Sequence, residues 1–363
     1  MTQPARSAEL AEVLGRDPGP HTITPLQHNE GNAVTAGIWR YAGTGWSAIC
    51  KHITRSGTGI GYWAASEDPA HWNYWAREPN AYRSGLTSTA YEGTGITGPQ
   101  LLAAFDRPDG VVLWLEDVTG TEGEHWDVDM VAELARRLGR GQGSYLAGRP
   151  LPGVDWLSRR WLRQYGASKP VDGSVLHDDA AWQLPEVATA YGDLRAGLTR
   201  LWDERAVLLR AVEALPQTLC HLDVWPKNLV ESEDRHVLLD WAFVGIGAVG
   251  EDAANLVPDC VWDGFLPLES LSALADRVWT GYLAGLREAG WAGDERLARL
   301  GFTAGGAAKY AWLAELSIRR LRRGELVSYG GYSRLALDDL FTTYAGVFEM
   351  LLTWAEEART LIH

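Results

Sequence analysis

The residues with the clearest chemical pattern lie between His221 and Asp240. The run His221-Leu222-Asp223-Val224-Trp225-Pro226-Lys227-Asn228 has the spacing H-x-D-x-x-x-x-N, and Asp240 ends the apolar segment that follows. Phosphoryl transfer to a hydroxyl needs a carboxylate near the acceptor oxygen and hard oxygen ligands for Mg²⁺. Asp223 suits the first role, and the oxygens of Asn228 and Asp240 suit the second. A lone Asp or Asn would indicate only a capped polar loop, but four residue types at this spacing favour catalysis.

At these residues the sequence resembles the aminoglycoside phosphotransferase and choline kinase family of kinase-like enzymes. Members carry an H-x-D-x-x-x-x-N loop, often with proline at the position of Pro226. The resemblance implies Asp223 as catalytic base, Asn228 and Asp240 as Mg²⁺ ligands, and His221 as an organiser of the loop. It also implies ATP or GTP as phosphate donor and a small hydroxylated acceptor, with antibiotic inactivation as the leading biological setting.

Two residues of this loop need separate comment. Trp225 stands where many relatives of the family have a polar residue. Lys227 lies two positions later, and we expect it to be a solvated surface charge rather than a phosphate ligand.

A lysine in the N-terminal third supports the same interpretation. The segments Val34–Tyr41 and Trp46–Ile53 read as two strands joined by a glycine-rich turn. Lys51 lies inside the second, where a charge needs a partner or a ligand unless the strand is a solvated edge. The resemblance implies that Lys51 holds the donor phosphates and pairs with a helix glutamate, for which Glu78 is the first candidate and Glu67 the second.

Two further segments are expected at the nucleotide. The loop before the first of these strands has small and polar residues whose backbone N–H groups could cover phosphates, which makes Gly31 and Asn32 candidates. Under the resemblance, residues 112–118 form the strand that leads to the hinge between two lobes. That position makes Glu116 and Val118 candidates for the pocket of the purine base.

The acceptor is expected on the opposite side from Lys51 and the metal. Residues 257–265 and 310–315 are available to form the wall there. Aromatic faces and carboxylates suit sugar rings, nucleoside bases or ammonium groups, although the same residues could be core packing and a solvated helix face. The candidates are Asp259, Trp262, Asp263, Tyr310, Trp312 and Glu315.

The order of elements predicts an α+β, bilobal protein-kinase-like fold. We expect an N-terminal lobe with an antiparallel sheet over residues 1–118 and a larger, mainly helical lobe over 119–363. Short strands are expected near 219–230 and 236–244. Helices are expected at 71–86, with a kink or the end of a first part at Pro79, from Met130 to Gly139, at 187–215, from Asp252 to Val257, and as three helices in 267–361.

A competing motif lies directly after Asp240. Residues 245–250 match G-x-G-x-x-G, the fingerprint of a dinucleotide-binding oxidoreductase. Asp240 in the preceding strand and Pro258 soon after the last glycine count against that alternative. A catalytically silent kinase-like binding protein is the other alternative, and the intact set of Asp223, Asn228, Asp240 and Lys51 counts against it.

Composition limits the partners. The chain has 363 residues and a net charge of −14, which argues against nucleic acid because phosphate-tracking surfaces need clustered Lys and Arg. No basic leader or apolar run of about 18 residues is visible, and the three cysteines lack metal-ligand or redox spacing. We therefore expect a cytoplasmic protein without a membrane partner.

Overall fold

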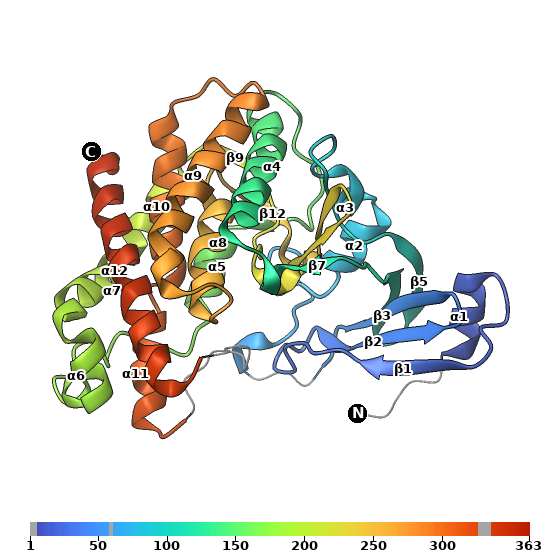
Figure 1. The fold of residues 1–363 in the computed structure, drawn as a ribbon, viewed down its shortest axis with the longest axis horizontal. Helices are drawn as coiled ribbons and strands as arrows, with labels where there is room; N and C mark the ends of the chain where they lie inside the picture. The colour runs from blue at the N-terminus through green and yellow to red at the C-terminus, as the bar shows by residue number, and fades with distance from the viewer. Residues whose placement is uncertain (1–5, 58–60, 326–334) are drawn as a thin grey trace.

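A five-stranded antiparallel sheet forms one end of the molecule. The computed structural model describes residues 6–57, 61–325 and 335–363, and Figure 1 shows the sheet beside a larger helical region. The strand order is β1-β2-β3-β6-β5, and every neighbouring pair is antiparallel. The bounds are β1 His21–Pro25, β2 Thr35–Gly43, β3 Trp46–Thr54, β5 Leu101–Arg107 and β6 Gly110–Glu116.

One face of this sheet packs against the N-terminal helix α1, Ser7–Leu14. Leu10 of α1 is fully buried and lies in one apolar cluster with Cys50 of β3 and Trp114 of β6. The Nε1 of Trp114 donates a hydrogen bond of 2.9 Å to Glu9. Because side chains alternate along a strand, the neighbours of Cys50 point to the other face, towards the helical region.

The helical region makes up most of the rest of the chain. Its helices are α4 Val128–Leu146, α5 Trp161–Ala167, α6 Pro185–Tyr191, α7 Arg195–Glu213, α8 Glu251–Trp262, α9 Leu271–Glu288, α10 Glu295–Tyr310, α11 Leu313–Arg322 and α12 Leu337–Ile362. Together with the sheet they confirm the predicted α+β, protein-kinase-like class. Four helices occupy the described part of 267–361 where three were predicted, and residues 326–334 of that range lie outside the described residues.

The predicted end of a helix at Gly139 is wrong. α4 continues to Leu146, and Gly139 lies at its contact with α9. A Cβ at this position would lie 2.1 Å from the carbonyl oxygen of Tyr282, and one at Gly285 of α9 would lie 1.9 Å from the carbonyl oxygen of Arg136. These glycines therefore serve the close approach of two helices rather than a helix end.

Other predicted helices differ in extent. Residues 71–86 contain only the short helix α2, Arg77–Arg83, followed by α3, Leu86–Thr89. Pro79 lies in the first turn of α2, where the missing N–H is not needed, so the predicted kink does not occur. The segment 187–215 is divided between α6 and α7. α8 begins at Glu251 and includes Pro258.

Two small sheets carry the loops with the chemical pattern. One has the order β4-β11-β10-β7 and the other β8-β12-β9. The bounds are β4 Ile96–Thr97, β7 Thr121–Glu122, β8 Ser158–Arg159, β9 Gln217–Cys220, β10 Leu229–Ser232, β11 Arg235–Leu238 and β12 Gly245–Ala248. β4 precedes residue 118, yet it pairs with β11 of the helical region.

The G-x-G-x-x-G segment is not a dinucleotide-binding turn. Its first residues form β12, and in the described residues only helices follow β12, so the strand-helix-strand unit that this fingerprint opens is not formed. A Cβ at Gly245 would lie 2.3 Å from the carbonyl oxygen of Ser158, and Gly250 has φ 93° just before α8. The glycines are explained by packing and backbone conformation, and the oxidoreductase alternative is wrong.

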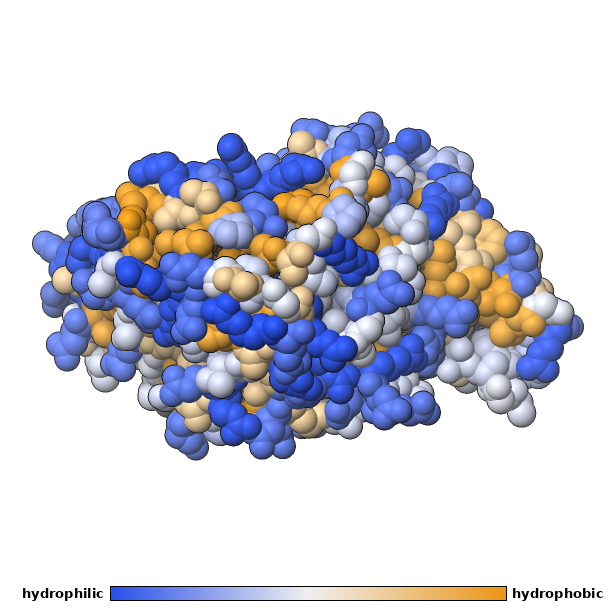
Figure 2. Space-filling view, turned by 90° about the horizontal axis from the view of Figure 1, so that it is seen from above, coloured by the Kyte–Doolittle hydropathy of each residue, from blue (hydrophilic) through white to orange (hydrophobic). Residues whose placement is uncertain are grey.

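The described surface is mainly polar. Figure 2 shows hydrophilic residues over most of one face, with apolar residues exposed both at the end formed by the small lobe and over the helical region. None of the described helices is long and apolar enough to cross a membrane. All three cysteines are buried and free.

Candidate active site

A cavity of about 660 Å³ lies where the five-stranded sheet meets the helical region. Its walls include β2, β3 and the end of β6 from the sheet, and the loops around β10, α8, α10 and α11 from the helical region. It brings together Asp223, Asn228, Asp240, Lys51 and Glu78, which are far apart in the sequence.

Lys51 lies between two carboxylates at the sheet side of this cavity. Its ammonium is 2.7 Å from Oε2 of Glu78 and 3.1 Å from Oδ1 of Asp240, and its side chain is almost completely buried. Burial favours the neutral amine, but Asp240 and Glu78 outweigh it and raise the pKa of Lys51. The lysine therefore stays charged. Glu67, the second candidate partner, is exposed.

Asp223 and Asn228 are held together within the loop after β9. The Nδ2 of Asn228 donates to Oδ2 of Asp223 at 2.9 Å and to its backbone oxygen at 3.1 Å. Burial raises the pKa of Asp223 to about 7, and the positive charge of Lys309 opposes that shift. A carboxylate with such a pKa can accept or give up a proton near neutral pH.

The oxygens of Asn228 and Asp240 fit Mg²⁺ bound to a nucleotide. Because Nδ2 of Asn228 is engaged by Asp223, its amide oxygen remains as the ligand atom, and the Asp240 side chain is 40% exposed. Within the described residues no cluster of three or more His, Cys, Asp or Glu could hold a metal alone. Mg²⁺ commonly takes one or two protein oxygens and completes its shell with phosphates and water, so this small donor set fits the ion.

Strained backbone marks both ends of this segment. Leu222 has φ 68° and Asp240 has φ 55°, which is the left-handed region that residues with a Cβ rarely adopt. Such conformations persist only where surrounding contacts enforce them, and they concentrate at functional sites.

Asp252 supplies those contacts at Leu222. Its two carboxylate oxygens accept the backbone N–H groups of His221 at 2.7 Å and Leu222 at 2.8 Å, and Gln142 donates to it at 2.8 Å. Asp252 lies in the first turn of α8, where a carboxylate is also favoured by the helix dipole.

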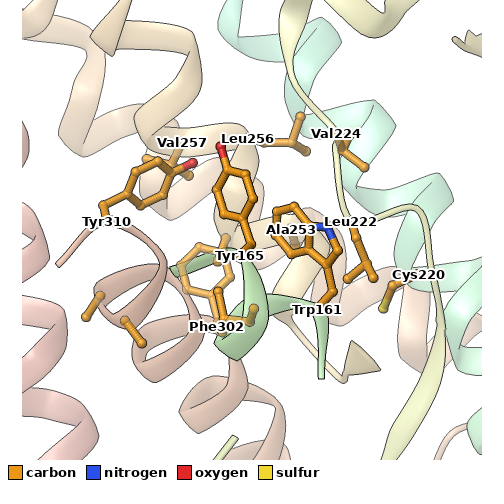
Figure 3. Packing of buried hydrophobic residues seen from close by; sticks show 14 of the residues in the cluster. Trp161, Tyr165, Cys220, Leu222, Val224, Ala253, Leu256, Val257, Phe302 and Tyr310 are labelled. Carbon is orange, nitrogen blue, oxygen red and sulfur yellow. The ribbon is translucent and has the colours of Figure 1, made fainter. Parts of the chain in front are cut away.

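The ring of His221 packs beneath the same loop. It is fully buried, and its centroid lies 5.0 Å from that of Trp241. Burial lowers the pKa of His221 to about 4, so the ring is neutral at physiological pH. Figure 3 shows Leu222 and Val224 of the loop next to Trp161 and Tyr165 of α5.

The loop before β2 lines the cavity but has few free donors. Gly31 N donates to Oδ1 of Asn29 at 3.0 Å, and Asn32 N donates to the backbone oxygen of Asn29 at 3.0 Å. The Oδ1 of Asn32 accepts from Val34 N and from Asn73. Gly31 and Asn32 thus shape the wall through bonds inside the loop, and their role at the donor phosphates stays a prediction.

The strand β6 brings Glu116 to the cavity, and Val118 follows it. The backbone N–H of Glu116 donates to Gln100 at 2.9 Å, and its carboxylate forms an ion pair with Arg235 and accepts from Gln100 N at 3.0 Å. Glu116 is thereby fixed at the point where the chain leaves the sheet.

The far end of the cavity contains most of the predicted acceptor residues, namely Asp259, Trp262, Asp263, Tyr310 and Trp312. One face of Trp262 is stacked on Tyr344 with ring centroids 3.5 Å apart, so that face packs within the protein. Asp263 is 6% exposed, and its Oδ1 has no hydrogen-bond partner among the described residues. Burial raises the pKa of Asp263 to about 7.

Two predicted positions are wrong. Glu315 does not line the cavity; it is fully buried, accepts the backbone N–H groups of Asp172 and Gly173, and pairs with Arg319. Lys227 is not a solvated surface charge, because it lines the cavity and forms an ion pair with Glu124.

The sequence reasoning also missed two lysines. Among 33 basic residues the chain has only four lysines, Lys51, Lys169, Lys227 and Lys309. Three of them line this cavity, and Lys169 contacts its aromatic wall. Because lysine is scarce in this arginine-rich chain, each lysine could have been singled out from the sequence as a candidate site residue.

Comparison with known proteins agrees with this geometry. Residues 92–295 match the sequence model of the phosphotransferase enzyme family. A comparison with curated protein sequences finds no match.

Solved structures with the same fold include three kinase-like proteins. A spectinomycin phosphotransferase in complex with ADP and spectinomycin is 12% identical over 98% of this chain and 99% of its own, with a TM-score of 0.54. An amicoumacin kinase in complex with AMP-PNP and Ca²⁺ is 12% identical over 91% and 88%, with a TM-score of 0.53. A choline/ethanolamine kinase family protein from Mesorhizobium loti is 16% identical over 98% and 97%, with a TM-score of 0.52.

The resemblance inferred at residues 221–240 is therefore confirmed at the level of the family. The matched region covers more than half of the 363 residues and contains the loop from His221 to Asp240. The chain belongs to the phosphotransferase enzyme family and is a phosphotransferase.

Proposed function

We propose that the protein transfers the γ-phosphate of ATP or GTP to a hydroxyl of a small molecule, either an antibiotic or another hydroxylated metabolite. The observation that carries this proposal is the convergence of Asp223, Asn228, Asp240 and Lys51 in one cavity. A catalytically silent binding protein would not require that complete set. The small lobe, residues 1–118, holds the donor, and residues 119–363 hold the acceptor.

Each residue has a role that follows from its contacts. Lys51, kept charged by Glu78 and Asp240, binds the donor phosphates. Asp223 accepts a hydrogen bond from the acceptor hydroxyl, orients it towards the γ-phosphate, and takes its proton. Asn228 orients Asp223 through the 2.9 Å bond to its carboxylate.

Asn228 and Asp240 are the residues that would hold Mg²⁺. The ion would neutralise charge on the phosphates at this end of the cavity. Asp252 and His221 keep the loop in place from beneath, where they contact neither substrate. The purine base lies by Glu116 and Val118, near the end of β6.

The rest of the chain is consistent with an intracellular enzyme. Three buried free thiols fit a reducing compartment such as the cytoplasm.

A thermal-shift panel tests the reaction class. ATP, GTP and NADPH are each added with and without Mg²⁺, and only the triphosphates should raise the Tm, more so with Mg²⁺. A shift with NADPH and none with either triphosphate would contradict the proposal. Incubation of the enzyme with γ-labelled ATP or GTP and a panel of antibiotics and hydroxylated metabolites then identifies the acceptor.

A further inference from the structure

Four aromatic rings at the acceptor end surround the ammonium of a lysine. We call Tyr62, Trp63, Tyr165 and Trp312 the aromatic cage. The Nζ of Lys169 lies 3.4 Å from the ring centroid of Tyr165, 4.8 Å from that of Trp312, 5.1 Å from that of Trp63 and 5.3 Å from that of Tyr62. All four rings line the cavity that contains Asp223. The space that the cage encloses is therefore continuous with the acceptor site.

The cage has the arrangement with which proteins bind ammonium ligands. A cation over an aromatic face gains roughly 0.5–2 kcal/mol, and several faces around one cation form a recognition site for methylated ammonium groups. Here the chain fills the cage with the end of its own Lys169 side chain, which is only 4% exposed. Since an ammonium is compact and a guanidinium is broad and planar, lysine fits this position where arginine would not.

The charges nearby do not favour a second cation. Lys309 is 7% exposed and lies 3.6 Å from Asp259, so that carboxylate already has a partner. Burial is the main cause that lowers the pKa of Lys169 well below its usual value; Lys309 and Arg320 act in the same direction, and Asp223 opposes them. An incoming cation would meet the charges of Lys309 and Arg320, which line the same cavity.

Asp263 offers a different kind of contact. Its buried Oδ1 lacks a hydrogen-bond partner among the described residues, and its side chain lines the same end of the cavity. A hydroxyl group of the acceptor can satisfy it without bringing a charge. Aromatic walls next to a carboxyl group suit a hydroxylated ring.

We propose that the acceptor is a hydroxylated molecule without a positive charge, and that Lys169 excludes cationic acceptors by filling the aromatic cage with the end of its own side chain. The proposal rests on the proposed phosphotransfer and narrows its substrate class. Discrimination of this kind comes from a repulsive element built against the wrong ligand, in addition to contacts with the right one.

Choline and 3,3-dimethylbutan-1-ol test this proposal, because they have the same shape and one hydroxyl and differ only in the charged nitrogen. Their Kd values are measured by calorimetry on the full chain with Mg²⁺ and AMP-PNP, with sodium chloride matching the ionic strength. For the wild type we expect at least a tenfold preference for the neutral alcohol, or undetectable choline binding. Tighter binding of choline than of the neutral alcohol would overturn the proposal.

Lys169→Ala then empties the cage. This variant should bind choline at least tenfold more tightly than the wild type does, with little change for the neutral alcohol. A folded Lys169→Ala protein with no gain for choline would overturn the proposal. If the variant does not fold, the wild-type comparison decides the outcome by itself.

Arg205→Ala is the matched control. Arg205 lies over the ring of Trp202 at 3.6 Å, so it makes the same kind of contact, and neither residue lines the cavity. It should leave both Kd values unchanged; a gain for choline equal to that of Lys169→Ala would mean general loosening and would overturn the proposal.

Failure of the proposed phosphotransfer is visible separately. Stabilisation of the wild type by Mg²⁺ and AMP-PNP reports on Lys51, Asn228 and Asp240, not on the cage. Loss of that signal contradicts the proposed function, whereas an unexpected preference for choline contradicts only the exclusion by Lys169.

Discussion

At the donor end of the cavity Lys51 lies between two carboxylates, whereas at the acceptor end the ammonium of Lys169 lies against ring faces. Under the proposed function the donor end binds the same triphosphate in every turnover, so direct ion pairs can hold its lysine in one position. The acceptor end has to distinguish one small molecule from others. Ring faces and buried carboxyl groups provide shape and selectivity there without a fixed ion pair.

The two ends also differ in how their residues are distributed along the sequence. The proposed reaction depends on a short segment, from His221 to Asp240, with Lys51 and Glu78 added by the sheet. The acceptor end is assembled from α5, α8, α10 and α11 and from the segment before α2, so no short motif describes it. Substitutions at the two ends should therefore change different kinetic constants.

The largest effect is expected where the two ends meet. Asp223→Asn keeps the shape of the side chain but removes the base, so kcat should fall by about 10²–10⁴-fold. The Kd of the triphosphate should stay nearly unchanged, because Asp223 contacts the acceptor. Radiolabel transfer and calorimetry measure the two quantities.

Asp234→Asn is the control for that substitution. Asp234 is exposed in the turn between β10 and β11, and the same chemical change there should leave kcat unaltered. Near-native turnover of Asp223→Asn would show that Asp223 is not the base.

Substitution of Asp252, which supports the loop from beneath, should have an almost equally strong effect, in this case on stability. Asp252→Ala removes the acceptor of two buried backbone N–H groups, those of His221 and Leu222. Each orphaned group costs about 1–3 kcal/mol, so the free energy of unfolding should fall by several kcal/mol, measured in urea. Asp252→Asn keeps one acceptor oxygen and should lie between Asp252→Ala and the wild type. Equal stability of all three proteins would contradict the proposed support.

The two ends of the cavity also differ in how well their residues could be predicted from the sequence. The loop from Asp223 to Asp240 is local, and its spacing alone predicted the groups that meet around one cavity. Lys51 and Glu78 were paired through the family resemblance. By contrast, Lys169 meets Tyr62 and Trp312 only through long-range packing, which no periodicity in the sequence reveals.

The helix predictions failed for a related reason. Gly139 has the local signature of a helix end, yet it lies at the contact of α4 with α9, and that contact depends on a segment more than a hundred residues away. Pro79 and Pro258 likewise have breaking signatures that tertiary contacts and position in the turn override. Local sequence rules indicate which backbone conformations a residue permits, and tertiary packing determines which of them the chain adopts.

A moderate effect is expected at the donor end alone. Asp240→Asn should weaken triphosphate binding in the presence of Mg²⁺ by at least about tenfold, because an amide is a poorer ligand than a carboxylate. Binding measured with EDTA should change less. Comparison of the two Kd values makes each protein its own control, and an unchanged effect of Mg²⁺ would exclude Asp240 as a ligand.

The smallest effect is expected at the acceptor end, where Asp263 is buried without a compensating bond. Burial raises the pKa of Asp263 to about 7 from its usual 3.8, and the neighbouring Asp259 acts in the same direction while Lys227 opposes it. Tyr344 of α12 packs on Trp262 beside it. The folded state thus favours the protonated acid. Its contribution to stability is complete below pH 3.8 and is lost as the pH rises towards 7.

Asp263→Asn cannot ionise, so it should not show this loss. Its free energy of unfolding relative to the wild type should increase by about 1–3 kcal/mol between pH 5 and pH 8, measured by urea unfolding at both values. The same variant should raise the KM of the acceptor far more than that of the triphosphate, because Asp263 lies at the acceptor end. A difference in stability that does not change with pH would show that Asp263 is ionised in the folded protein, with a partner for its charge. Equal effects on both KM values would remove Asp263 from the acceptor site and weaken the contrast between the two ends of the cavity.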